Sequence, residues 1–151
     1  MAGNPSSGAF ATRSLTNQIY MTIFTRIINR EIPGHIVAEN DQVIAFLDIH
    51  PLVRGHTLVV PKQEVDYFFD LDEELYLELN RFARQVAIGL KKAIPCERIA
   101  TAVIGLEVPH AHLHLIPINT MDDANFSRPK LQLSDEEMSE VADRIRTQLS
   151  T

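Results

Sequence analysis

The stretch that decides the fold is Pro109-His110-Ala111-His112-Leu113-His114-Leu115-Ile116-Pro117. Successive side chains of a β-strand point to opposite faces of the sheet, so alternate residues share a face. The three histidines would therefore project together, while the apolar residues between them would face a core. Three of the six histidines of the chain lie in this segment, which packing alone explains poorly. The pattern predicts a strand over His110–Ile116 with one working face.

The flanking segments carry helix and strand signals that do not alternate strictly. Apolar residues at helical spacing predict a short helix over Ile23–Arg30, capped by Thr22, and a long helix capped by Asp72 and stopped by Pro95. A capping box at Ser134 begins a last helix over residues 134–149. Four more strands are expected: Ile36–Glu39, Val43–Leu47, His56–Pro61 and Ile99–Ile104. This order favours an α+β domain with an antiparallel sheet of about five strands.

Length and composition limit the class of protein. The chain has 151 residues, which suggests one domain, and a net charge of -6 without a basic cluster, which disfavours nucleic acid as a partner. A single cysteine, Cys96, and the absence of a signal segment or a long apolar run favour a cytoplasmic protein with no membrane contact. Residues 1–20 are polar and patternless, which indicates a leader or tag, or a disordered tail, before a single domain over 21–151.

The shared histidine face suits two kinds of chemistry. Neighbouring histidines on one face lie roughly 6.7 Å apart and could share a Zn²⁺ ion, but no other histidine of the chain has a companion at ligand spacing. A neutral imidazole can instead attack a phosphoryl group when a backbone carbonyl holds its other nitrogen. His112 is then the natural nucleophile, because it has a hydrogen-bond donor on either side.

The run from His110 to Ile116 resembles the signature of the histidine triad (HIT) family, His-φ-His-φ-His-φ-φ with φ apolar. The segments Ile23–Pro33, Ala45–Ile49 and Gly55–Lys62 resemble further blocks of this family in the same order. The resemblance implies an antiparallel α+β fold, a homodimer whose sheet continues across both copies, and a purine nucleotide ligand without a cofactor. It also implies cleavage at the α-phosphate of a nucleoside phosphoramidate, an adenylated conjugate or a dinucleotide, through a nucleotidyl-histidine intermediate.

The resemblance assigns roles by position. It implies that His112 is the nucleophile, that His114 contacts the α-phosphate, that His110 orients the triad and that His56 lies near the phosphate. It implies that Asp48 holds the ribose hydroxyls, for which a carboxylate is a fitting acceptor. The base pocket would be walled by apolar side chains that plain core packing would explain equally well, namely those of Phe24, Ile27, Phe46 and Ile49.

Two departures from the family pattern affect ligand binding. Many bacterial relatives bind structural zinc through Cys-x-x-Cys and a histidine, but Thr22, Thr25 and Glu64 occupy those positions here, which predicts that no metal binds. In the short loop before the triad, Glu107 and Val108 occupy the phosphate-contacting region, where phosphoramidase relatives carry a serine at position 107. A carboxylate there opposes an anionic phosphate unless it points away or is protonated. This favours an alternative function, a nucleotide-binding regulatory module with little turnover.

A third departure is the helix over residues 134–149, which replaces the familiar C-terminal segment of the family. Because C-terminal regions help to shape substrate choice in the family, the identity of the leaving group is not carried over.

Overall fold

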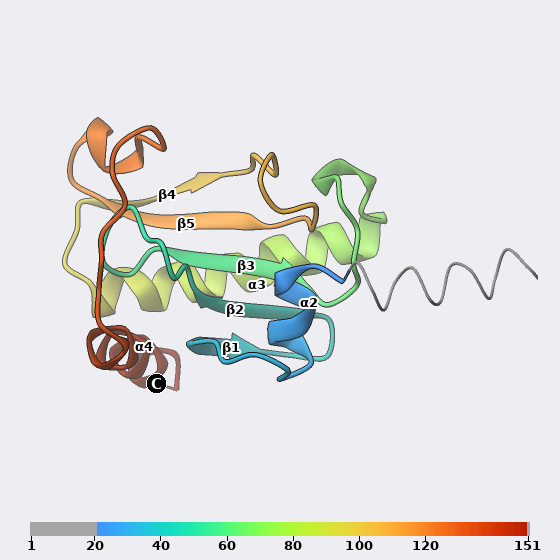
Figure 1. Ribbon diagram of the computed structural model, residues 1–151, viewed down its shortest axis with the longest axis horizontal. Helices are drawn as coiled ribbons and strands as arrows, with labels where there is room; N and C mark the ends of the chain where they lie inside the picture. The colour runs from blue at the N-terminus through green and yellow to red at the C-terminus, as the bar shows by residue number, and fades with distance from the viewer. Residues whose placement is uncertain (1–20, 151) are drawn as a thin grey trace, which may run out of the picture.

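The computed structural model describes residues 21–150. The elements follow in the order α2 (Ile23–Ile28), β1 (Ile36–Glu39), β2 (Val43–Leu47), β3 (Thr57–Pro61), η1 (Phe68–Asp70), α3 (Glu73–Ala93), β4 (Arg98–Ala102), β5 (Leu113–Ile118), η2 (Met121–Ala124) and α4 (Asp135–Leu149). The α+β class, the five strands and the three predicted helices are confirmed (Figure 1). The predicted leader, residues 1–20, lies outside the described residues.

One sheet organises the domain. Its strand order is β1-β2-β3-β5-β4, and each neighbouring pair is antiparallel. Strand β5 lies between β3 and β4, and His114 pairs with Leu58 of β3. Figure 1 shows α3 running behind the strands, α4 beside β1, and α2 on the near face at one end of the sheet. No helix within residues 21–150 is long and apolar enough to cross a membrane.

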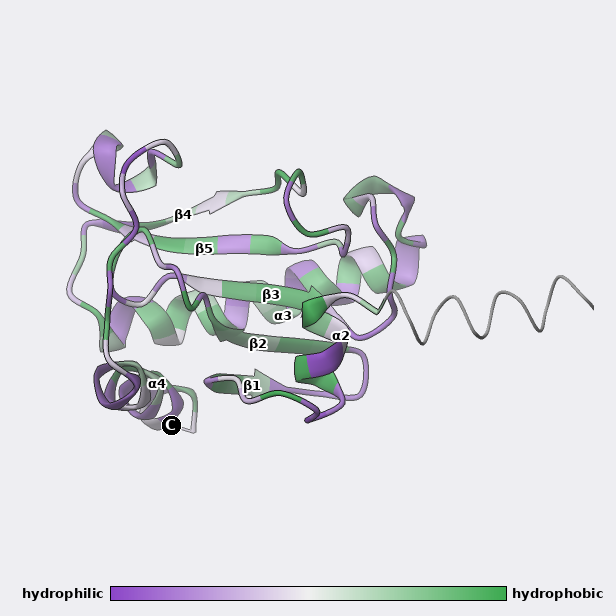
Figure 2. Ribbon diagram, viewed as in Figure 1, coloured by the Kyte–Doolittle hydropathy of each residue, from purple (hydrophilic) through white to green (hydrophobic). Residues whose placement is uncertain are grey.

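The two faces of the sheet bury different clusters. The larger cluster joins one face to α3 and α4, and it includes Ala111, Leu113 and Leu115 from the histidine segment. The smaller cluster, on the other face, packs Phe24 and Ile27 of α2 against β2 and β3. Figure 2 shows the central strands β2 and β3 as largely hydrophobic. The prediction that the apolar residues between the histidines face a core is therefore confirmed.

Local signals begin each helix where the sequence predicts. The hydroxyl of Thr22 accepts a hydrogen bond from the Thr25 amide, and the carboxylate of Asp72 accepts one from the Leu75 amide. Ser134 and Glu137 form the predicted capping box. Helix α2 is shorter than predicted and ends at Ile28, because the chain turns into the left-handed region at Arg30, with φ of 61°.

The histidine segment corrects one prediction. The fifth strand begins at Leu113, so His110 and His112 precede it. The His110 amide donates to the nearby Val108 carbonyl at 2.8 Å instead of to a neighbouring strand. Pairing between β5 and β3 ends at Leu113 and Val59, although β3 itself continues to Pro61. Smaller differences concern the third strand, which starts at Thr57, and the fourth, which covers Arg98–Ala102.

Candidate active site

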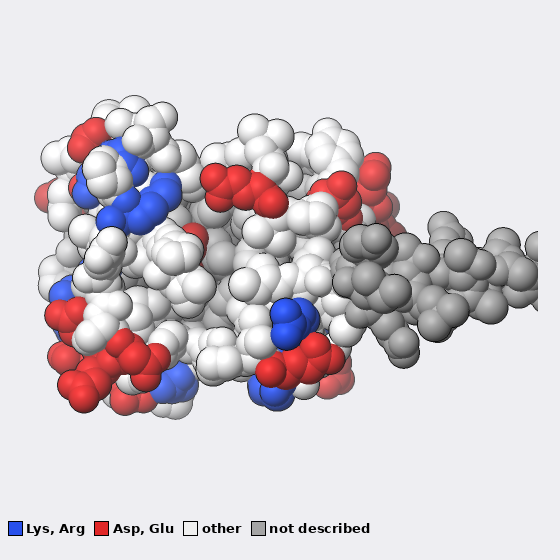
Figure 3. All heavy atoms as spheres, in the orientation of Figure 1, with Lys and Arg blue, Asp and Glu red and all other residues white. Residues whose placement is uncertain are grey.

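A cavity of about 430 Å³ opens on the face of the sheet opposite α3, a size that suits a small-molecule ligand. His112 and His114 line it together with parts of α2, the loop after β2 and the loop before the triad. The segment Asn119–Leu133, called the C-terminal strap below, adds Phe126 and Lys130. Figure 3 shows this face hollowed near its centre, with basic side chains gathered at one edge of the hollow and acidic ones at the opposite edge.

The cavity brings together most of the residues predicted from the sequence. Eight of them line it: Phe24, Asp48, Ile49, His56, Glu107, Val108, His112 and His114. His110, the first histidine of the triad, is fully buried and does not line the cavity. Ile27 and Phe46, predicted as pocket walls, lie in the smaller core cluster behind Phe24, where Phe46 packs edge-on against the Phe24 ring. They support the wall without forming it.

The geometry around His112 fixes the position of its ring hydrogen. Nδ1 of His112 lies 2.6 Å from the carbonyl oxygen of His110. Because a carbonyl oxygen can only accept, Nδ1 carries a hydrogen, and in the neutral form of the ring the free electron pair lies on Nε2. The Phe24 ring packs edge-on against the imidazole with centroids 5.0 Å apart. An imidazole oriented in this way in a cavity wall is the arrangement that a nitrogen nucleophile requires.

A second chain of hydrogen bonds reaches His114. The Leu52 amide donates to Nδ1 of His56 at 3.0 Å, so the hydrogen of His56 lies on Nε2. That Nε2 donates to Nδ1 of His114 at 2.9 Å, which leaves the hydrogen of His114 on its own Nε2. Burial, and then the charge of His114, lower the pKa of His56 to about 3. Burial, and then His112, lower the pKa of His114 to about 4, so both rings are neutral near pH 7.

His110 is held from two sides. Its Nε2 donates to the Pro61 carbonyl at 2.8 Å, and its Nδ1 accepts from the Thr22 hydroxyl at 2.8 Å. Glu64 completes this group, since one carboxylate oxygen accepts from the Thr22 amide and the Thr25 hydroxyl, each at 2.9 Å. Thr22, Thr25 and Glu64 thus hold His110 by hydrogen bonds at the positions where zinc ligands stand in some relatives. That no metal binds there stays a prediction.

Asp48 lies beside the histidine pair. One carboxylate oxygen accepts from the His50 amide at 2.9 Å, and the other lies 3.8 Å from Nε2 of His56. Burial raises the pKa of Asp48, although the His50 amide opposes this. Asp48, His56 and His114 offer ligand atoms within 4.8 Å of one another. A metal ion there would have to displace the hydrogen shared by the two imidazoles, so the observed arrangement is that of a hydrogen-bonded site.

The C-terminal strap carries site residues that no motif of the sequence identifies. The Phe126 ring packs edge-on against His114 and His56, with centroids 5.0 and 6.2 Å apart. The Lys130 ammonium lies 5.2 Å from the centre of that ring, and its charge helps to lower the pKa of His114. Long irregular segments in compact domains are often functional, and the length of Asn119–Leu133 was the one available signal.

Comparisons with known proteins agree with this architecture. The HIT domain family matches residues 29–121. An uncharacterized HIT-like protein of Borreliella burgdorferi is 36% identical over 135 residues, which cover 84% of this chain and 97% of the relative. The chain belongs to the HIT family.

Two solved structures extend the likeness to three dimensions. A Hit-like protein from Bartonella henselae, described as involved in cell-cycle regulation and solved with an unknown ligand, superposes with a TM-score of 0.74 at 32% identity. The match covers 85% of this chain and 96% of that one. A hypothetical histidine triad nucleotide-binding protein from Sulfolobus tokodaii superposes with a TM-score of 0.75 at 30% identity, covering 84% and 91% of the two chains.

Proposed function

We propose that this protein is a nucleotidyl hydrolase or transferase that cleaves at the α-phosphate of a purine nucleoside phosphoramidate, an adenylated conjugate or a dinucleotide. The observation that carries the proposal is the hydrogen bond of 2.6 Å between Nδ1 of His112 and the His110 carbonyl. This bond leaves the Nε2 electron pair of His112 available in a residue that lines the cavity. The related protein of Sulfolobus tokodaii, described as nucleotide-binding, supports a nucleotide as the ligand.

The proposed reaction has two steps. The Nε2 electron pair of His112 forms a bond to the α-phosphorus, and the bond to the leaving group breaks with its electrons on the leaving group, which water protonates. Water then attacks the phosphorus of the nucleotidyl-histidine, and His112 departs with the electron pair of the nitrogen–phosphorus bond. The Nε2 hydrogen of His114 donates to a phosphate oxygen and stabilises the charge that develops there.

The rest of the cavity suits a nucleoside. Ile49 is 54% exposed and Ile23 is 44% exposed, so these apolar side chains at the cavity wall remain available to cover a purine base. Asp48 has one carboxylate oxygen without a direct hydrogen bond in the described chain, and it would accept from the ribose hydroxyls. Lys130 is the one lysine or arginine among the described residues that line the cavity, and it would offset the charge of the phosphate.

One observation favours the alternative of a nucleotide-binding regulatory module with little turnover. Glu107 lines the cavity and is exposed, so its carboxylate keeps full access to water. An ionised carboxylate in that position disfavours a doubly charged phosphate and slows the reaction if it faces the leaving group. The backbone amides of the same loop remain the available phosphate donors.

The decisive experiment uses adenosine phosphoramidate. We expect mass spectrometry to show an adenylyl-enzyme and released AMP with the unaltered chain, and neither with His112→Asn or His112→Gly. His35→Asn is the matched control, because His35 pairs with Asp135 at 3.1 Å and does not line the cavity. AMP binding without turnover of any of the three substrate classes would instead establish the regulatory module. Activity abolished by chelators would reject both in favour of a metal-dependent hydrolase.

We also propose that two copies pair through β4, as the family resemblance implies. β4 is the outermost strand on one side of the sheet, while α4 packs beside the opposite outermost strand, β1. An open groove next to β4 carries the half-exposed Ile88, which is 45% exposed, and Ile99. We expect Ile88→Glu to convert a dimer into a monomer in light scattering; an unaltered chain that runs as a monomer would refute pairing. A cytoplasmic location stays a prediction.

A further inference from the structure

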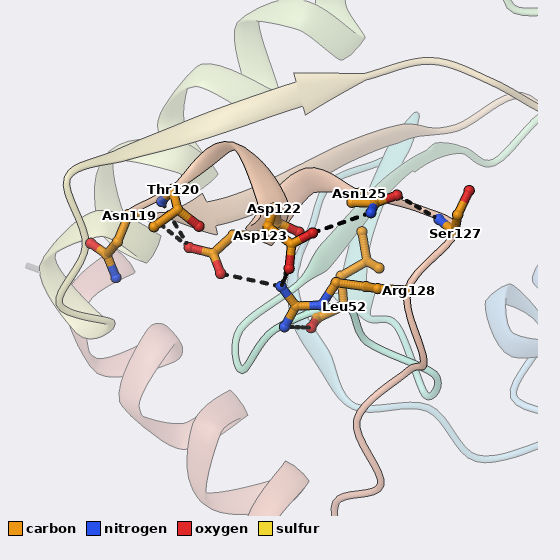
Figure 4. A network of polar contacts seen from close by, with 8 residues as sticks. All are labelled: Leu52, Asn119, Thr120, Asp122, Asp123, Asn125, Ser127 and Arg128. Atoms are coloured by element: carbon orange, nitrogen blue, oxygen red, sulfur yellow. Dashed lines mark hydrogen bonds and ion pairs between the residues drawn. The ribbon is translucent and has the colours of Figure 1, made fainter.

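Arg128 ties the C-terminal strap to the loop that precedes His56. Figure 4 shows its guanidinium between the carboxylates of Asp122 and Asp123 and the carbonyl of Leu52. Nη1 donates to the Asp122 carbonyl at 2.9 Å and lies 3.3 and 3.4 Å from the two carboxylates. Nη2 donates to the Leu52 carbonyl at 3.4 Å. The two aspartates therefore orient a guanidinium that grips a backbone group 76 positions earlier in the chain.

Leu52 connects this grip to the histidines. Its carbonyl binds Arg128, and its amide is the donor that holds Nδ1 of His56. The Leu52 side chain is fully buried, so any movement of this residue would disturb the packing around it. A second tether runs in parallel, from the Leu131 amide to the Pro51 carbonyl at 2.8 Å. The strap thus holds two consecutive peptide units: the one that joins Pro51 to Leu52 and carries the Leu52 amide, through Leu131, and the next one, through Arg128 and the Leu52 carbonyl.

The Leu52 amide selects between two arrangements of hydrogens. In the observed one, His56 donates from Nε2 and His114 accepts at Nδ1. In the alternative, His56 carries its hydrogen on Nδ1, accepts at Nε2 from Nδ1 of His114, and leaves Nε2 of His114 without a hydrogen. The bond of 2.9 Å between the rings is compatible with both. The Leu52 amide excludes the alternative, because two donors cannot face each other.

We propose that Arg128 is a positioning residue: by holding Leu52 it keeps His56, and through it His114, in the form that presents an Nε2 hydrogen to the cavity. Nothing else among the described hydrogen bonds reaches the Leu52 carbonyl. Without the guanidinium, the loop relaxes and the alternative arrangement gains population. The use of the Nε2 hydrogen for a phosphate rests on the proposed function, whereas the link between Arg128 and the tautomer of His114 does not.

The test reads the tautomer directly in the ligand-free, full-length chain. Nitrogen-15 NMR distinguishes protonated from unprotonated ring nitrogens, so we expect Nδ1 of His56 and of His114 to read as unprotonated in the unaltered protein. In Arg128→Met, the two nitrogen shifts of each ring should move toward each other. Arg128→Lys keeps a cation between the aspartates and Leu52 and should restore most of the difference.

The control is Arg144→Met. Arg144 also donates to a distant backbone carbonyl, that of Ala93 at 2.8 Å, but it ties α4 to α3 away from the cavity. In Arg144→Met, the nitrogen shifts of His56 and His114 should match those of the unaltered chain. Unchanged histidine shifts in a folded Arg128→Met protein would overturn the proposal, and equal changes in Arg144→Met would reduce it to a general loss of stability.

Kinetics supply an independent readout. A displacement of 1 Å in a catalytic group can cost roughly 100-fold in rate, and a partial change of tautomer should lower kcat by roughly tenfold with little change in KM. If the unaltered chain shows no turnover, the NMR result still decides the role of Arg128, and only the proposed function fails. A fall in kcat without a change in the nitrogen shifts would overturn the tautomer explanation.

Discussion

Removal of one buried hydroxyl, in Thr22→Val, should destabilise the fold more than a typical surface change. The Thr22 side chain accepts from the Thr25 amide at the start of α2 and donates to Nδ1 of His110 at 2.8 Å. Loss of an N-cap costs about 1 kcal/mol, and a buried acceptor left without its donor costs about 1–3 kcal/mol. Because His110 is fully buried, water cannot replace the hydroxyl, and we expect a total of about 2–4 kcal/mol.

Urea denaturation followed by circular dichroism at pH 7 measures this cost. Thr22→Ser keeps the hydroxyl and should stay within about 1 kcal/mol of the unaltered chain. Thr25→Val is the matched control. The Thr25 hydroxyl donates to the exposed Glu64 and lies 3.4 Å from Nδ1 of His110, against 2.8 Å for the Thr22 hydroxyl, so its loss should cost about 1 kcal/mol or less. A cost for Thr22→Val of below 1 kcal/mol, or one equal to that of Thr25→Val, would refute the view that this hydroxyl satisfies His110.

Three further outcomes are expected. The folded-state pKa values of His56 and His114, about 3 and 4, lie below the unfolded value of 6.5, so the unfolded state binds protons first as pH falls. The free energy of unfolding should therefore drop between pH 7 and pH 5, by on the order of 1–2 kcal/mol for each ring. In urea titrations, His56→Gln should make this drop smaller. Lys130→Met should raise KM roughly fivefold, as expected for the loss of about 1 kcal/mol from an exposed charged contact, and should change kcat by no more than about twofold. The control Lys62→Met should leave steady-state kinetics unchanged. Equal KM values for the two variants would contradict a contact between Lys130 and the phosphate. Gly55→Ala should destabilise by about 2 kcal/mol or more in thermal unfolding, because φ is +91° and the added Cβ would lie 2.9 Å from Ile94; an unchanged Tm would disprove the strain.

The fold was largely predictable because its signals are local. Helix caps at Thr22, Asp72 and Ser134 act within three residues of the chain. The continuous apolar run of β2 and the alternation of histidines with apolar residues up to the start of β5 need no knowledge of partners. The start of β5 was not predictable in the same way. Whether a strand continues through His112 depends on where the neighbouring backbone finds its hydrogen bonds. Pairing of β5 with β3 stops at Leu113 and Val59, and the Ala111 amide donates instead to the carbonyl of Val65, 46 positions earlier in the chain.

The candidate site was predictable for residues in recognisable motifs and not for the others. His112, His114, His56 and Asp48 lie in segments with a family pattern, and the structure brings all four to one cavity. Phe126 and the other strap residues have no pattern of their own. They reach the histidines because the strap folds back over the sheet, and that return path depends on tethers between residues far apart in the chain.

The sequence anticipates a backbone carbonyl behind the His112 nucleophile, but it does not say which backbone groups place the ring hydrogens of His112, His56 and His114, and these hydrogens decide what the site can do. Two independent hydrogen-bond chains converge on the cavity: one runs through the His110 carbonyl to His112, and the other through Leu52 and His56 to His114. The first chain leaves an electron pair on Nε2 of His112, and the second leaves a hydrogen on Nε2 of His114. Neighbouring histidines of one motif therefore acquire opposite roles without any difference in residue type. Each role is set by a backbone group, a carbonyl in one case and an amide in the other. A change in the loops that carry those backbone groups would therefore alter the chemistry while leaving the histidine triad itself intact.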